Sequence, residues 1–151
     1  MERNRRGRRE GLIQTITLAF YKLLDGGEAF IKPDAKKWVA PYNVNIIGFQ
    51  GTISSFPPLH AQAWLITNPE ALKQEQVILE DPTAGIFGHI NSGSAGMANQ
   101  TTVFPQGKSI SLKKGEALYL GVWGHNMWSV LGWKQKADFH CHYDIYYEEA
   151  V

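Results

Sequence analysis

Arginine is missing from almost the whole chain. The only five, Arg3, Arg5, Arg6, Arg8 and Arg9, stand in the first ten residues, and every later fixed positive charge is a lysine. The first ten residues therefore carry a net charge of +3, whereas the rest of the chain carries −2. This asymmetry divides the sequence into a basic arm, residues 1–11, and a nearly neutral body, residues 12–151, of a size that suits a single domain.

Cysteine is scarce, and signals for export or membrane insertion are missing. Because Cys141 is the only cysteine, no internal disulfide can form and the fold needs no oxidising compartment. The first apolar stretch, residues 11–24, is interrupted by Gln14 and Lys22. It is too polar for a signal peptide and too short for a membrane span. We expect intracellular assembly and no membrane span.

Motifs for covalent catalysis and cofactor binding are also missing. The sequence has no G-x-S-x-G, no P-loop and no dinucleotide fingerprint. Cys141 alternates with Phe139 and Tyr143 on the apolar side of a predicted strand, which is typical of a small buried core residue. We predict that the protein has no catalytic residues, binds no cofactor and is not an enzyme.

His140 and His142 are the best candidates for metal ligands. Two residues apart on one strand, their imidazoles project from the same face about 7 Å apart, a spacing that can chelate one ion. The pair resembles the His-x-His of cupins, which are also jelly rolls, but Asp144 lies about 13 Å along the strand from His140. His89 or His125 would have to complete the site. We predict no metal here, and a polar outer face instead.

Alternating apolar residues predict a protein made of strands. In residues 138–149 the apolar side chains fall on one face, and residues 12–21 alternate in the same way. Further strands are expected in residues 38–54, 60–66, 75–81, 109–112 and 117–122, with a turn at residues 113–115. One short helix begins at Asn68-Pro69, and residues 81–107 are expected to form a long surface loop. About eight strands predict an antiparallel β-sandwich or jelly roll.

Three tryptophans cluster between the last two predicted strands. Trp123, Trp128 and Trp133 stand in a glycine-rich segment that is typical of a hairpin or loop, whereas Trp38 and Trp64 stand within predicted strands. Exposed tryptophan stacks on sugars or on a partner protein, and buried tryptophan fills a core. Both roles stay open for this cluster, with at least one of the three expected to be packed.

The stretches "TTVFPQGKSISLKKGEALYLGVWG" and "DFHCHYDIYYEE" resemble the small single jelly-roll subunits of viruses and bacteriophages. The likeness covers residues 38–149 as a pattern of strands and turns, which trimeric adhesins and tumour-necrosis-factor-like domains share. It implies a capsid, decoration or vertex protein, assembled in the host cytoplasm and resident in the virion. Its partners would be copies of itself or other capsid proteins.

The basic arm fits this resemblance in either of two ways. Arginine forks onto carboxylates or phosphates, so Arg3, Arg5, Arg6, Arg8 and Arg9 predict a contact with an acidic groove of a neighbouring subunit, or with nucleic acid. We favour the protein contact. The alternative function is a carbohydrate- or receptor-binding β-sandwich at a fibre tip that uses Trp123, Trp128 and Trp133, and a cupin-like metalloenzyme comes third.

Overall fold

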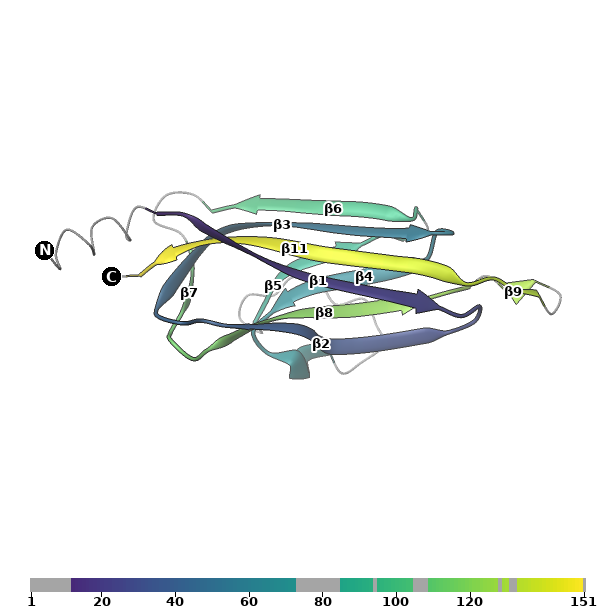
Figure 1. Cartoon of the computed structure of the whole chain (residues 1–151), viewed down its shortest axis with the longest axis horizontal. Coiled ribbons are helices and arrows are strands. Elements are labelled where there is room, and N and C mark those ends of the chain that lie inside the picture. The colour runs from purple at the N-terminus through teal and green to yellow at the C-terminus, as the bar shows by residue number, and fades with distance from the viewer. Residues whose placement is uncertain are drawn as a thin grey trace, which may run out of the picture.

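Strands make up nearly all of the structure. This computed structural model describes residues 12–72, 85–93, 95–104, 109–127, 129–130 and 133–150. The elements, drawn in Figure 1, are β1 (Gln14–Leu24), β2 (Ala29–Val39), β3 (Val44–Phe56), β4 (His60–Ile66), the 3-10 turn η1 (Pro69–Leu72), β5 (Ile86–Asn91), β6 (Met97–Val103), β7 (Ile110–Leu112), β8 (Ala117–His125), β9 (Ser129–Val130), β10 (Trp133–Lys134) and β11 (Ala137–Glu149).

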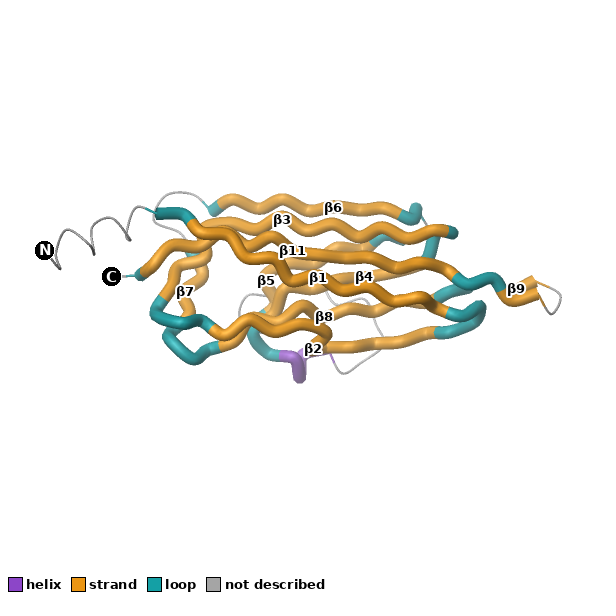
Figure 2. Tube along the Cα trace, viewed as in Figure 1, coloured by secondary structure: helices purple, strands orange, loops and turns teal. Residues whose placement is uncertain are grey.

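Two antiparallel sheets pack face to face. Sheet A has the order β1-β11-β3-β6, with β7 also pairing with β3, and sheet B has the order β2-β8-β4-β5. If the eight strands other than β7, β9 and β10 are counted along the chain, these orders become 1-8-3-6 and 2-7-4-5. That is the double Greek-key order of a jelly roll, so the predicted fold class is confirmed. Figure 2 shows how little of the described chain lies outside strands.

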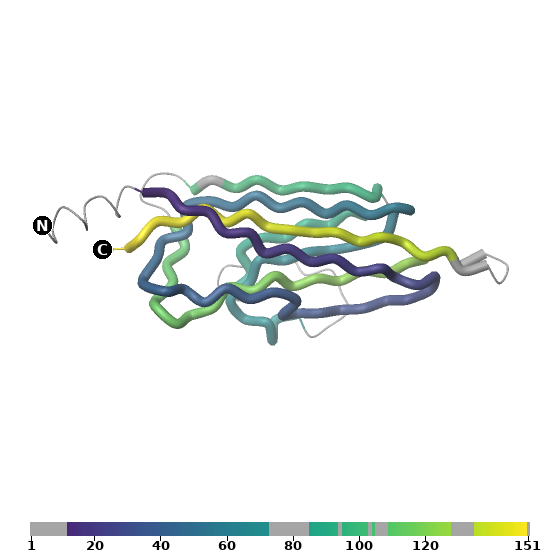
Figure 3. Tube along the Cα trace, viewed as in Figure 1, coloured from purple at the N-terminus to yellow at the C-terminus, as the bar shows by residue number. Residues whose placement is uncertain are grey.

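The first and last strands of the chain lie side by side in the same sheet. β1 pairs with β11 along its whole length, from Gln14 opposite Tyr147 to Leu24 opposite Ala137. Figure 3 shows this as a purple strand beside a yellow one. On the other side, β11 pairs with β3, so the last strand is a central strand of sheet A. The last strand therefore leaves no edge exposed, because β11 has a neighbour on each side.

The core follows the alternation that the sequence shows. In β11, the side chains of Phe139, Cys141, Tyr143 and Ile145 are buried between the sheets, as predicted. In β1, Leu18 and Leu24 turn inward, whereas the odd-numbered residues are exposed. A strand with one apolar face can bury that face only against a second layer, which sheet B supplies.

A second apolar cluster lies on the opposite face of sheet B. Trp64, Ile66, Leu72 and Ile86 are buried there, and the partly buried Trp123 packs against them. η1 contributes Leu72, and its start matches the sequence: the Asn68 side chain accepts a hydrogen bond from the Glu70 amide at 3.2 Å. The expected short helix is thus present as a 3-10 turn in the described residues.

The sequence predicted one strand over residues 38–54, but the structure divides this segment between two strands. Trp38 and Val39 end β2, residues 40–43 turn, and β3 then begins at Val44. Pro41 lies in this turn, where its missing N–H removes no ladder hydrogen bond. β3 is irregular near Gly48, where its register against β11 shifts between Tyr146 and Tyr147.

The long loop expected over residues 81–107 is also wrong. Within it, β5 pairs with β4 and β6 pairs with β3. Gly88 favoured the prediction of a loop, because glycine usually marks turns. In β5, however, a Cβ added at Gly88 would lie 3.0 Å from Phe49 Cε2 and from Tyr143 Oη. The glycine is needed for close packing of the strand. The strand expected at residues 75–81 lies outside the described residues.

Among the described residues, no helix is long and apolar enough to cross a bilayer.

Candidate functional site

The outward face of sheet A is the most distinctive surface of the molecule. Residues directly opposite one another in paired strands point to the same side of the sheet, so the register fixes rows that cross four strands. One row joins Tyr21 of β1, His140 of β11, Ser54 of β3 and Met97 of β6. The next row toward the end of the sheet joins Leu23, Asp138 and Phe56.

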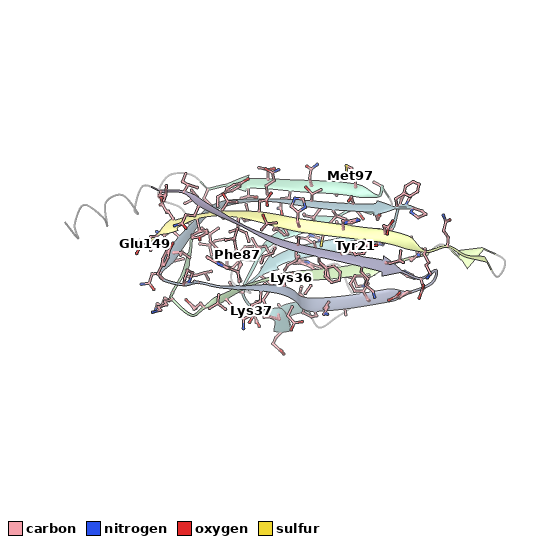
Figure 4. The ribbon with its side chains drawn as sticks, viewed as in Figure 1. Tyr21, Lys36, Lys37, Phe87, Met97 and Glu149 are labelled. Atoms are coloured by element: carbon pink, nitrogen blue, oxygen red, sulfur yellow. The ribbon has the colours of Figure 1, made fainter. Side chains whose placement is uncertain are left out.

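These two rows carry four large, exposed apolar side chains, which lie on either side of Ser54, His140 and Asp138, and we call this surface the apolar end. Its large side chains are Tyr21, Leu23, Phe56 and Met97, which are 55%, 44%, 78% and 63% exposed. They come from three strands that are far apart in the sequence, and Figure 4 labels Tyr21 and Met97 at its two sides. Large apolar side chains gathered on one exposed face are typical of a contact surface.

Acidic side chains follow β11 through the apolar end and along the rest of the same face. Asp138, Asp144 and Glu148 project outward along β11, and among the described residues of this face no lysine or arginine accompanies them. Two of the carboxylates accept hydrogen bonds from β1: Thr17 Oγ1 donates to Asp144 at 2.5 Å, and Tyr21 Oη donates to Asp138 at 2.8 Å. The face is therefore acidic.

Tyr21 is held as a neutral phenol. The hydrogen bond to the Asp138 carboxylate raises the pKa of the Tyr21 hydroxyl, and the negative charge of Asp138 acts in the same direction. The Tyr21 ring also lies 4.6 Å from the His140 ring, centroid to centroid. These contacts fix the ring in place, so it presents a stable aromatic surface to a partner.

An open groove of about 760 Å³ follows the β1 edge of this face. It is lined by Thr17, Tyr21, His140, His142 and Asp144 on one side and by Lys32, Ala35 and Lys36 of β2 on the other. Figure 4 labels Tyr21 and Lys36, which stand on the two neighbouring strands. β2 is irregular here, because its register against β8 shifts between Lys32 and Lys36. A bulge of this kind protects an edge from pairing with another chain.

The two candidate metal ligands lie on this outward face, as the alternation predicted. His142 Nε2 is 3.8 Å from Asp144 Oδ2, whereas the His140 ring contacts Tyr21. Among the described residues, no group of three or more histidine, cysteine or carboxylate side chains could hold an ion. Neither His89 nor His125 joins the pair: His89 stacks on Trp64, and His125 lies against Trp123.

The predicted tryptophan cluster is only partly described. Trp123 is not at a loop tip but within β8, where its ring is half-buried against the second cluster and lies 5.0 Å from the His60 ring. The glycines around it had suggested a loop, yet Gly124 gives room for the Phe30 ring. Trp133 stands in β10 of a two-stranded hairpin, and its side chain lies outside the described residues, as does Trp128.

The basic arm was the other predicted contact. Arg3, Arg5, Arg6, Arg8 and Arg9 all lie outside the described residues, so their role stays a prediction. Sequence reasoning did not find the apolar end, because its members come from separate strands. The available signal was that Tyr21 and Leu23 fall on the outward side of an alternating strand.

Comparisons with known proteins gave weak likenesses to solved structures. No family model matches the chain, and no curated protein matches it. VP2 of an infectious bursal disease virus subviral particle is similar to this chain with a TM-score of 0.39 and 8% identity, over 94% of this chain and 38% of VP2. The chain thus spans well under half of VP2.

Two further structures are similar over most of their own length. A virus-like particle protein of the extra small virus of the prawn Macrobrachium rosenbergii has a TM-score of 0.34 and 9% identity, over 89% of this chain and 80% of that one. A periplasmic inhibitor of g-type lysozyme from Aeromonas hydrophila has a TM-score of 0.33 and 10% identity, over 85% of each chain. Viral capsid proteins are therefore among the similar structures, but these scores assign no function to the chain.

Proposed function

We propose that the protein is a structural subunit of a virus particle, of the capsid, decoration or vertex type. Residues 12–151 would form the jelly-roll domain, and residues 1–11 would form an arm that contacts a neighbouring subunit. In this role the protein is not an enzyme and belongs to the virion, with copies of itself or other capsid proteins as partners. The jelly roll is an architecture of capsid proteins, but also of lectins and cupins. The fold therefore does not distinguish these functions, and the proposal rests on the surface of the protein.

The observation that carries the proposal is the apolar end of sheet A. Phe56 and Met97 are more exposed than their size and hydrophobicity favour, and they share the outward face of sheet A with Tyr21 and Leu23, on a surface that no other described element covers. A subunit that buries this surface against a neighbour gains about 25 cal/mol for each Å² removed from water. A stable contact of this kind buries at least about 1,000 Å² in total.

Sedimentation velocity and electron microscopy of the purified chain test the proposal. We expect a closed ring or shell, or a discrete oligomer, at micromolar concentration. Replacing both Phe56→Ser and Met97→Ser should weaken that assembly, whereas the matched pair Val39→Ser and Met127→Ser, which are also exposed but lie outside the apolar end, should not. A chain that stays monomeric at every concentration, in the absence and presence of nucleic acid, contradicts the proposal.

A second candidate function is glycan or receptor binding, which one observation favours. Trp123 lies on the outward face of sheet B with His60 and His125 beside it, at ring distances of 5.0 and 6.5 Å. A partly exposed indole flanked by polar rings is typical of a sugar-binding platform. In a glycan titration, quenching of tryptophan fluorescence that is lost in Trp123→Ala supports this function, and an unchanged signal across a glycan panel rejects it.

A further inference from the structure

The outward face of sheet A has the charge pattern of a receptor for the arginine arm. Its fixed charges among the described residues are the carboxylates Asp138, Asp144 and Glu148, and all of them stand on β11. Every arginine of the chain stands in residues 3–9. Opposite charges are thus segregated onto two parts of the same chain, which favours contact between them.

The spacing of the arginines along the arm matches the spacing of the carboxylates along β11. In an extended chain alternate residues point the same way, so Arg3, Arg5 and Arg9 share one side of the arm. Arg3 and Arg9 are six residues apart, about 20 Å, and Asp138 and Asp144 have the same separation along β11. With those two pairs aligned, Arg5 reaches the row of His140 and Tyr21, where a guanidinium can stack on the phenol ring.

The arm of the same copy would have to reverse direction and extend fully to make both contacts. It leaves the sheet next to Glu148, since Gln14 pairs with Tyr147, whereas Asp138 lies at the other end, opposite Leu23. Ten strand residues separate these rows, or about 33 Å. From Leu12 back to Arg3 the arm spans about 30 Å when fully extended, and the reversal of direction takes up a turn. A neighbouring copy's arm needs no such reversal.

We propose that residues 3–9 of one subunit lie extended along β11 of a second copy, with Arg3 on Asp138, Arg5 on Tyr21 and Arg9 on Asp144. This inference rests on the proposed function and names the acceptor surface that assembly uses. The lysines nearby flank this path: Lys32 and Lys36 line the β2 side of the groove, and Lys136, before β11, lies 3.9 Å from Asp25.

Charge-swapped full-length chains test this arrangement. A face variant carries Asp138→Lys and Asp144→Lys, an arm variant carries Arg3→Glu and Arg9→Glu, and a control carries Asp34→Lys and Glu70→Lys, on exposed residues outside sheet A. We expect face and arm variants each to self-associate at least about tenfold more weakly than the native chain, from the usual strength of a few exposed ion pairs. The control should associate like the native chain.

Mixing the face variant with the arm variant tests whether the arm of one copy contacts the face of another. An equimolar mixture of face and arm variants should recover association to within about threefold of the native level, because each acidic arm meets a basic face and each basic arm meets an acidic one. Circular dichroism confirms folding, and if a lysine variant is unfolded, Asp138→Asn with Asp144→Asn replaces it in the self-association measurement. The double asparagine variant should self-associate severalfold more weakly than the native chain.

The outcomes separate this inference from the proposed function. If the native chain assembles and the face variant assembles equally well, or if the mixture fails to recover, the acceptor surface is wrong while the structural role stands. If the arm variant loses only nucleic acid from the particle, the arm is a genome contact and the inference is also wrong. If the native chain does not assemble at all, both proposals fail.

Discussion

Gly51→Ala is expected to be one of the most damaging single substitutions in the core, although it adds only a methyl group. Gly51 lies in β3 directly opposite Tyr143 of β11. A Cβ at this position would lie 2.5 Å from Tyr143 Cε1 and 2.6 Å from Ile90 Cδ1, well inside van der Waals contact. The glycine is required because the Tyr143 ring lies across its backbone.

The neighbours have little freedom to move away. Tyr143 is fully buried, its ring packs edge-on against Phe49 at 5.8 Å, and its hydroxyl donates to Gln100 Oε1 at 3.3 Å. Overpacking a close-packed core costs about 1–3 kcal/mol, and two simultaneous overlaps favour the upper end of that range. About 3 kcal/mol corresponds to a fall in Tm of roughly 6–12 °C for a chain of this size.

Urea and thermal unfolding of four variants measure the effect. Thr52→Ala, at the adjacent position on the solvent side of β3, is the control and should cost less than about 1 kcal/mol. In a Tyr143→Ala background the overlap with the ring is gone, so Gly51→Ala should cost much less there. The steric explanation is refuted if Gly51→Ala costs no more stability than Thr52→Ala. It is also refuted if the cost of Gly51→Ala is the same in the Tyr143→Ala background as in the native chain.

Three further predictions concern the core and the histidines. Burial raises the pKa of the Cys141 thiol from 9.0 to about 12, so the unfolded chain loses this proton first. Stability should therefore fall as pH rises from about 9 to 12, by up to about 1.4 kcal/mol per pH unit, and Cys141→Ala should flatten that dependence. Trp64→Ala should lower the free energy of unfolding in urea by about 3–5 kcal/mol, because the Trp64 side chain is only 1% exposed. Trp123→Ala should lower it clearly less, because Trp123 is half-buried, and equal losses would contradict this explanation. Elemental analysis should find no stoichiometric metal, whereas one ion per chain that is lost in His140→Ala with His142→Ala would favour a metalloenzyme.

The sequence by itself determined the local features whose cause lies within a few residues. The alternation in residues 137–149 placed Phe139 and Tyr143 in the core, because a strand with one apolar face has only one stable orientation against a second layer. The turn at residues 113–115, which separates β7 from β8, was equally clear, since Gly115 takes a positive φ of 90°. The concentration of arginine in the arm is also a property of the sequence alone.

Only the tertiary structure decided which distant segments meet. Gly88 disfavours a strand locally, yet β5 exists because the neighbouring strand β4 and the rings of Phe49 and Tyr143 fill the space around this glycine. The apolar end arises in the same way, because Leu23 and Phe56 lie on either side of Asp138 only where β1 and β3 both flank β11. Strand pairing across more than a hundred residues leaves no local trace, and this pairing determines the surface on which the proposed assembly depends.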